Sequence, residues 1–402
     1  LADPRPALSA AEVAALGEHL GEDASAVDAR RAACERYLDT ALPDRVNHLW
    51  RFTDPAGLLP ATLNARVLAG ADVTPVDLPP VEGAAATIDL WPGRAPVVNV
   101  AAGHDPATLT IGALAQGTEA GGRSGARPDQ SLLFSLLGEA AWNAGLAVEV
   151  AANTVLAGPV HVRVHATGEA MLPRIALRAG TGAEATLVEE HLGSGSVVGR
   201  TEVRAGAGAR VRHVILQNWG PMGRGYLSIR SRAERDADVL TVFGSFGGDR
   251  VKVEMNTILD GPGAHSEMIG VALGADRQRC DLHTGHHHRA SDTTSNIDFK
   301  AVMGGRARSS YTGLIRIDED APRTEAFQTN RNLLLSDRAG ADAIPELEIL
   351  NEEVSCSHGA TVAPVDPDQL FYLESRGLDA DESLRLVVRG FLEKTLKSLP
   401  AV

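Results

Sequence analysis

Hydrophobic residues near the N-terminus recur at helical spacing. Ser9 and Glu12 form a capping box, and apolar residues follow on one face. The same spacing returns from about residue 25 and ends at Pro43, and it appears again in residues 132–142 behind a cap at Asp129. These patterns predict three helices, with a mixed and irregular stretch between the second and the third.

From about residue 146 to 350 the pattern changes to short β-rich runs. These runs are Ala147–Val150, Val160–Val164, Ala185–Glu189, Val211–Gln217, Val239–Phe243 and Val251–Ile258. Small polar turns lie between them, and the central alanines of four such turns (Ala183, Ala209, Ala237 and Ala264) are spaced by 26, 28 and 27 residues. This period is typical of a solenoid, whose rungs bury inward side chains against each other. The alternative is a β-sandwich, in which the chain turns about every 8–12 residues. The longer spacing found here therefore favours a parallel β-helix.

The C-terminal part is helical again. Asp366 with Pro367 begins one helix, and Asp379 caps a second whose apolar stripe extends to Leu399. The sequence therefore predicts a mainly β protein with an N-terminal helical and mixed region (1–145), a β-helix core (146–360) and a C-terminal helical region (361–402). The C-terminal helices either cap the solenoid or dock a partner. Their apolar candidates for docking are Leu370, Phe371, Leu373, Leu386, Val387 and Phe391.

Composition narrows the function. The 402 residues include 52 acidic and 38 basic side chains, a net charge of −14, with few aromatic residues, which argues against binding nucleic acid. Only three cysteines occur, and neither a membrane-spanning apolar run nor a signal-peptide pattern is found, so we expect a cytoplasmic protein. The chain lacks a Gly-Lys-Ser/Thr phosphate loop, an H-E-x-x-H motif and a G-x-S-x-G elbow, which excludes the corresponding ATPases, metalloproteases and hydrolases.

One cluster of residues has metal-binding chemistry. Cys280, His283, His286, His287 and His288 lie within nine residues, and thiolate and imidazole together suit zinc or iron. On a strand, Cys280, His286 and His288 share one face, whereas His283 and His287 point to the other. The candidate ligands are Cys280, His283, His286 and His288, and the alternative is a polar corner loop without metal.

A second candidate is the pair Cys356 and His358. Residues two apart on a strand project from the same side. The pair suits a thiolate–imidazole couple or two ligands to one soft metal, while a buried structural thiol is the alternative.

Four longer runs carry a resemblance to a known family. They read Phe327-Gln328-Thr329-Asn330-Arg331-Asn332-Leu333-Leu334-Leu335-Ser336-Asp337, then Pro345-Glu346-Leu347-Glu348-Ile349, then Cys356-Ser357-His358-Gly359-Ala360-Thr361-Val362 followed by Gln369-Leu370-Phe371-Tyr372-Leu373-Glu374-Ser375-Arg376-Gly377. These runs resemble the C-terminal core of the SufB/SufD family of the Suf iron–sulfur cluster assembly machinery. The resemblance is dense over residues 280–392, and Leu49-Trp50-Arg51-Phe52-Thr53 is similar to the family's N-terminal Trp–basic–aromatic–Thr element. Asn330, where SufB carries its interface cysteine, and Gly359, where SufB carries a glutamate, make the chain similar to the SufD branch.

The resemblance implies a right-handed parallel β-helix with helical ends. It implies a scaffold subunit, not an enzyme, that pairs with SufB through the β-helix end and binds the SufC ATPase through the C-terminal helices. It also implies no stably bound cofactor but a transient iron–sulfur cluster at the SufB–SufD interface. There His358 would be a ligand or proton-handling group, with Cys356 beside it as a sulfur-handling or structural thiol.

Several alternatives stay open from the sequence. The chain is either this SufD-type subunit, a SufB-like scaffold that builds a cluster alone, a carbohydrate-active β-helix enzyme, or a metal-binding solenoid that uses Cys280 and the histidines. A homodimer of the isolated chain is an alternative to pairing with SufB.

Overall fold

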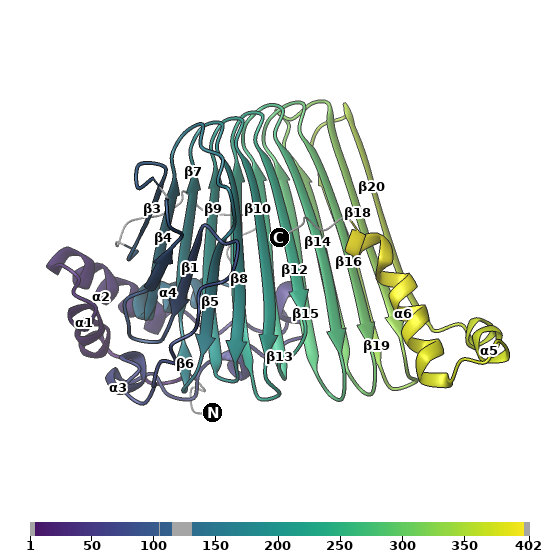
Figure 1. The fold of residues 1–402 in the computed structure, drawn as a ribbon, viewed down its shortest axis with the longest axis horizontal. Helices are drawn as coiled ribbons and strands as arrows, with labels where there is room; N and C mark the ends of the chain where they lie inside the picture. The colour runs from purple at the N-terminus through teal and green to yellow at the C-terminus, as the bar shows by residue number, and fades with distance from the viewer. Residues whose placement is uncertain (1–4, 104, 115–130, 398–402) are drawn as a thin grey trace.

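Stacked β-rungs form the centre of the protein in this computed structural model, which describes residues 5–103, 105–114 and 131–397 (Figure 1). Helices flank the rungs at both ends of the chain. The predicted class, a mainly β protein with a parallel β-solenoid core, is confirmed. None of the helices in the described ranges combines the length and the apolar content needed to cross a bilayer.

The N-terminal region contains helices where its periodicity predicts them, with irregular segments and short strands between them. The capping box of Ser9 and Glu12 is present, and the side chain of Asp23 caps the second helix. The third predicted helix is also confirmed, although its predicted cap Asp129 lies outside the described residues. The elements are α1 (Ala10–His19), α2 (Ala24–Asp39), η1 (His48–Trp50), η2 (Pro55–Leu58), α3 (Ala65–Leu68), β1 (Ala86–Leu90), β2 (Val97–Val100), β3 (Leu109–Gly112) and α4 (Leu132–Ala141).

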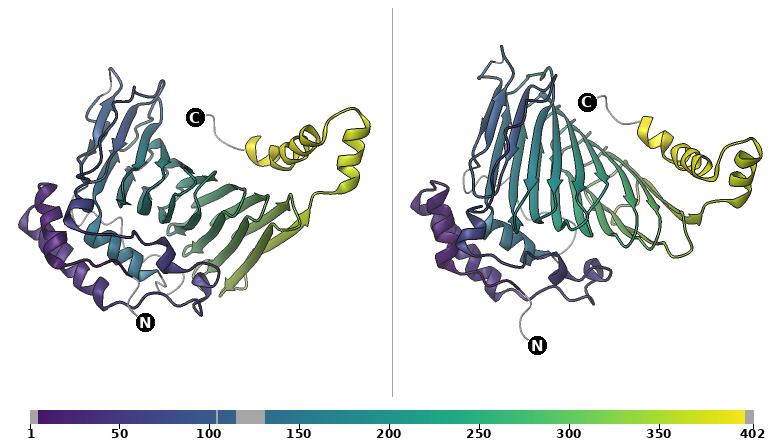
Figure 2. Two further views of the ribbon diagram at one scale, coloured as in Figure 1. Left: turned by 90° about the horizontal axis from the view of Figure 1, so that it is seen from below. Right: turned by 60° about the horizontal axis from the view of Figure 1, so that its bottom comes forward.

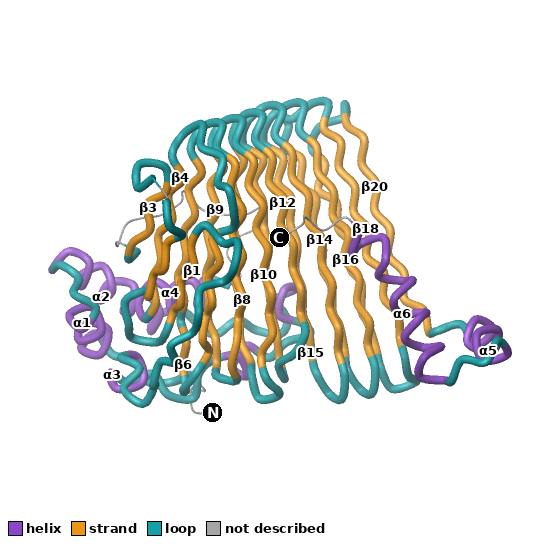
Figure 3. The backbone as a smooth tube through the Cα atoms, in the orientation of Figure 1, coloured by secondary structure: helices purple, strands orange, loops and turns teal. Residues whose placement is uncertain are grey.

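The remaining strands form two sheets that face each other (Figure 3). Sheet A contains β1 and β2 and then β5 (Val160–Ala166), β8 (Glu184–Gly193), β10 (Arg210–Trp219), β12 (Asp238–Ser245), β14 (His265–Gly274), β16 (Thr294–Met303), β18 (Thr324–Leu334) and β20 (Val354–Pro364). Sheet B contains β3 and then β4 (Ala144–Val150), β6 (Ala170–Met171), β7 (Pro173–Ala179), β9 (Ser196–Ala205), β11 (Arg224–Ala233), β13 (Arg250–Leu259), β15 (Arg279–His288), β17 (Arg308–Ile317) and β19 (Gly340–Ile349). From β7 onward the chain alternates between the sheets, and each strand pairs in parallel with the strand of the next rung. One rung therefore consists of two strands.

The sequence period of 26 to 28 residues is one complete rung. The alanines that define it, such as Ala183 and Ala209, are fully buried at one edge of the solenoid. Each follows a residue with positive φ, such as Gly182 (φ 66°) or Asp236 (φ 57°), because the chain reverses there in the left-handed region. The repeated Gly-Ala and Asp-Ala turns are therefore the corners of the rungs.

In sheet B, β4 and β13 correspond to the predicted runs Ala147–Val150 and Val251–Ile258, whereas the other return strands were not among the predicted runs. β9 and β11, for example, lie between two predicted strands but carry charged residues on their outward face, such as Arg200 and Arg230. The boundary that we expected at residue 145 also falls inside the sheets. β1 already pairs in parallel with β5, and β3 pairs with β4, because these short strands close the first rungs.

Helices cover opposite faces of the solenoid (Figure 2). Trp50 stacks on Phe134 of α4 with ring centroids 4.9 Å apart and on Tyr226 of β11, so the N-terminal helices pack on the outer face of sheet B. At the other end, α5 (Pro367–Ser375) begins at the predicted Asp366 cap, and α6 (Ala380–Lys397) lies on the outer face of sheet A. Leu399, the end of the predicted stripe, lies outside the described residues.

Candidate functional site

The solenoid ends in an uncovered rung. Within the described residues β20 pairs only with β18, and β19 pairs only with β17. Each therefore presents a free edge of backbone donors and acceptors, and the inward-facing side of β20 is exposed. Edges of this kind are templates for pairing with another chain. This last rung is therefore the part of the solenoid whose strand edges are available for pairing with another chain.

His358 and Cys356 both lie on the inward-facing side of this rung. In the register of sheet A, Cys356 is paired with Ala326 and His358 with Gln328, and both of these partners are buried. The alternation of β20 therefore places the thiol and the imidazole on one side, as the sequence predicts. His358 is exposed, whereas Cys356 is half-buried beside Ile315 and Ile317. Burial raises the pKa of the Cys356 thiol, so the thiol form is favoured.

The other candidate cluster is divided between two environments. Cys280, His286 and His288 face the interior and His283 faces outward, as predicted for a strand. Cys280 and His286 are six residues apart, which is about 20 Å on a strand, so they do not meet. Burial raises the pKa of Cys280 to about 12. Among the described residues, no three His, Cys, Asp or Glu side chains are grouped to hold a metal ion.

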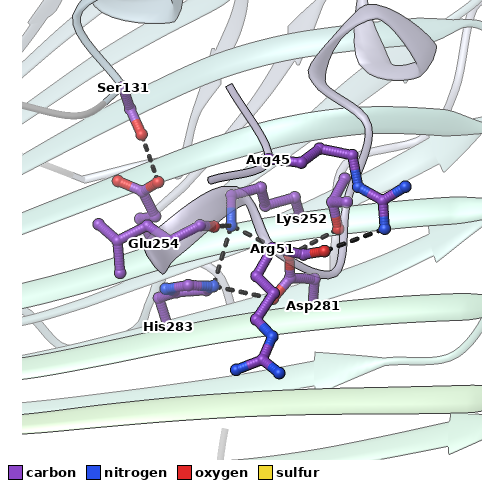
Figure 4. Close-up of polar contacts among 9 residues, drawn as sticks. Arg45, Arg51, Ser131, Lys252, Glu254, Asp281 and His283 are labelled. Carbon is purple, nitrogen blue, oxygen red and sulfur yellow. Dashed lines mark hydrogen bonds and ion pairs between the residues drawn. The ribbon is translucent and has the colours of Figure 1, made fainter. Parts of the chain in front are cut away.

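His283 belongs to a buried polar cluster under the N-terminal segment (Figure 4). Its Nε2 lies 2.8 Å from Asp281 Oδ1 and 2.9 Å from Lys252 Nζ, which in turn contacts Asp281 Oδ2 at 3.1 Å. Burial alone would raise the pKa of Asp281, but the charge of Lys252 and the pairing with His283 outweigh it and hold that pKa well below its usual range.

The segment Leu49–Thr53, which contains the Trp–basic–aromatic–Thr element, covers this polar cluster. Lys252 Nζ donates to the carbonyl of Leu49 at 2.6 Å and lies 4.7 Å from the ring centroid of Trp50. Thr53 Oγ1 donates to Asp281 Oδ2 at 2.5 Å. The element therefore fastens the N-terminal region to the outer face of sheet B.

His286 and His288 are bonded inside the solenoid. His286 Nε2 lies 2.9 Å from Ser266 Oγ, and His288 contacts Thr293 and Ser295 at 2.8 and 2.9 Å. Burial lowers the pKa of His286, and it lowers that of His288 to about 3. Both imidazoles are therefore neutral in the folded protein at neutral pH.

These two histidines predict a loss of stability on mild acidification. The unfolded chain takes up their protons below about pH 6.5 and the folded chain does not, so the free energy of unfolding falls as pH decreases. The expected slope is up to about 1.4 kcal/mol per pH unit for each histidine. Urea unfolding between pH 5 and 7.5 measures this slope, and His288→Asn should reduce it. Thr257→Val, at a buried inward-facing position in register with His286, is the control because it removes no titrating group; an equal slope in both variants would contradict the prediction.

The interior carboxylate of Glu189 does not interfere with this measurement. Burial alone would raise its pKa, but His213 and His191 outweigh this and lower the pKa to about 2. Its contribution to stability is complete above about pH 4.3 and is lost only as pH falls below that value.

A second exposed feature lies on the C-terminal helices. Phe371 is 71% exposed and Leu386 is 47% exposed. A groove of about 410 Å³ lies between α5 and α6 and is lined by Asp368, Gln369, Tyr372, Leu373, Leu386 and Val387. Phe391, also a docking candidate, packs on sheet A together with Leu392. Of the predicted docking residues, Phe371 and Leu386 are thus the most available to a partner.

Sequence reasoning missed two features of these sites. Lys252 and Asp281 were not singled out, although a lysine in a chain with only four is an unusual residue at a buried strand position. Gln328 lay within a quoted run, but nothing local indicates that it neighbours His358. Lys252 and Asp281 lie on different rungs, as do Gln328 and His358, and only the stacking of the rungs brings each pair together.

Comparison with known proteins agrees with the runs near the last rung. Residues 162–391, more than half of the chain, match the family described as SUF system FeS cluster assembly, SufBD core domain. The chain is 29% identical over 262 residues to the iron-sulfur cluster assembly SufBD family protein ML0594 of Mycobacterium leprae, covering 63% of this chain and 67% of that protein. It is 30% identical over 268 residues to the SufBD family protein Rv1462 of Mycobacterium tuberculosis, covering 64% and 68%.

Another relative is much longer than the matched segment. The SufBD family protein Rv1461 of Mycobacterium tuberculosis is 35% identical over 192 residues, which is 48% of this chain but only 23% of that protein. The chain therefore spans about two thirds of some curated relatives and less than a quarter of others.

Proposed function

The chain belongs to the SufBD family of iron–sulfur cluster assembly proteins, and from this premise we propose that it acts as a SufD-type scaffold subunit. In this proposal the uncovered last rung pairs with a SufB-type partner, and the nascent cluster is built where the two ends meet. The observation that carries it is the exposed imidazole of His358 on the inward-facing side of that rung.

The composition of the last rung supports a shared site. The cluster is cargo, and the described residues do not group three ligands for a metal ion, so a partner must complete the ligand set. A neutral imidazole binds iron less strongly than a thiolate does, which suits a cluster that must leave. Cys356 lies on the same side as the imidazole, but its raised pKa makes it a weaker ligand. We therefore assign the leading role to His358.

Departures from SufB support the SufD-type assignment. Asn330 stands where SufB carries its interface cysteine, and Gly359 stands where SufB carries a glutamate. Asn330 is buried, and its Nδ2 donates to the carbonyl of Phe299 at 3.2 Å, so this position is occupied by a structural amide. We expect the chain to need a partner for the thiolate.

The C-terminal helices are proposed to dock a SufC-type ATPase. The chain contains no phosphate loop, so hydrolysis would belong to the partner. The exposed Phe371 and the groove between α5 and α6 offer an aromatic anchor beside an apolar cleft, which is the usual composition of a binding hot spot.

This docking assignment predicts that Phe371→Ala weakens binding of the ATPase about tenfold, the usual cost of removing an aromatic anchor. Affinity is measured by titrating purified full-length chain with a SufC-type ATPase. Met222→Ala is the matched control, because Met222 is equally apolar and 77% exposed but lies in a turn of the solenoid. Equal affinity of the wild type and the Phe371 variant would place the ATPase elsewhere.

A further inference from the structure

Gln328 is buried without a hydrogen-bond partner among the described residues. Its side chain on β18 is only 2% exposed, and neither Nε2 nor Oε1 is hydrogen-bonded to another described residue. Most buried side-chain amides are bonded, because an unsatisfied amide costs stability. A buried amide without a partner needs a reason.

The position of Gln328 suggests that reason. It is in register with His358, and both side chains point to the inward-facing side of sheet A. Strands of one sheet lie about 4.8 Å apart, so Gln328 is directly beneath the exposed imidazole. The next residues down the same column are Ile297 and Met268, which are apolar. Gln328 is therefore the polar group of this column that can reach His358.

The Gln328 amide packs against a glycine of the opposite sheet. A methyl group on Gly313 of β17 would collide with the Gln328 amide and would lie 2.6 Å from the hydroxyl oxygen of Tyr311. That hydroxyl is already paired with Thr284 Oγ1 at 2.7 Å. Because Gly313 has no side chain, the Gln328 amide fits beside it, and among the described residues it has no hydrogen-bond partner there.

We propose that Gln328 is a positioning residue for His358. This rests on the proposed function, in which His358 binds iron through one ring nitrogen. That nitrogen must be unprotonated, and the other nitrogen then carries the proton. Oε1 of Gln328 accepts this N–H when the partner covers the last rung. The bond fixes the ring orientation and the tautomer, as hydrogen-bond partners of metal-bound histidines generally do.

The test uses the complex of this chain with SufB-type and SufC-type partners, and the probe is Fe²⁺ alone. Gln328→Leu should lower the affinity of the complex for Fe²⁺, measured against a ferrous chelator, about 10- to 100-fold. Gln328→Glu keeps an acceptor oxygen and should remain within a few-fold of wild type. Ile297→Leu, a conservative change in the same column, is the matched control and should have no effect.

A merely structural role predicts a different set of results. Since Gln328→Leu replaces an unsatisfied amide by an apolar group of similar size, the isolated chain should unfold at the same or a higher temperature, and the complex should still form. A lower unfolding temperature, a failed complex or unchanged Fe²⁺ affinity would each overturn the positioning role. If His358→Ala lowers Fe²⁺ affinity and Gln328→Leu does not, only this inference fails. If neither variant changes it, the proposed function fails as well.

Discussion

Replacing His358 by alanine should lower iron–sulfur cluster assembly by the reconstituted complex about 100-fold or more. Removing a hydrogen-bond partner of a metal ligand typically costs 10- to 100-fold in metal affinity, and removing the ligand itself should cost at least the upper end of this range, about 100-fold. The imidazole is exposed on the last rung and contacts no described residue through a hydrogen bond or ion pair, so the solenoid should fold unchanged. The cluster chromophore, formed from iron and a sulfur donor, measures the result.

The control is a neighbouring position on the same strand. Ser357 is also exposed but points to the opposite side of β20, so Ser357→Ala changes the same segment without touching the site. It should assemble clusters at the wild-type rate. Normal assembly by His358→Ala would remove His358 from the mechanism, and assembly by the isolated chain would indicate a SufB-like scaffold instead.

The second large effect concerns the cluster that fastens the N-terminal region. Lys252→Met keeps the apolar stem beside Trp50 but leaves the buried carboxylate of Asp281 without its cation. Breaking a buried ion pair in this way should lower the free energy of unfolding by about 3–5 kcal/mol. Urea unfolding at pH 7 measures the loss.

Two further variants separate charge from packing. In Lys252→Met with Asp281→Leu the unpaired charge is gone, and most of the lost stability should return. Lys397→Met removes an exposed lysine paired with Glu393 one helical turn away, and should leave the free energy of unfolding nearly unchanged because exposed ion pairs contribute little to stability. A loss below about 1 kcal/mol in Lys252→Met would mean that the cluster does not fasten the N-terminal region.

Both large effects arise where the regular stacking of rungs is interrupted. In the described part of the chain no further strand pairs with β20 beyond His358. On the outer face of sheet B, the segment Leu49–Thr53 covers Lys252 and Asp281. A repeat places each side chain in one of a few columns. The role of His358 and the attachment of the N-terminal region therefore depend on which other segments cover these stacked side chains.

Sequence alone determined what depends on local spacing. The corner turns at Ala183 and Ala209 indicated the rung period, because each corner needs a residue with positive φ followed by a small buried one. Alternation along a strand placed Cys356 beside His358 on one side and turned His283 away from His286. These relations require only the conformation of one segment.

Only the tertiary structure decided relations between segments. The pairing of β9 with β11, the pairing of Lys252 with Asp281 and the register of Gln328 under His358 each join residues from different rungs. A register shift by one residue would turn every side chain of a strand to the other face, so one side chain can be placed beneath another only when the exact pairing of the two strands is known. Since stacking of the whole solenoid sets that register, the sequence could name His358 but not the residue beneath it.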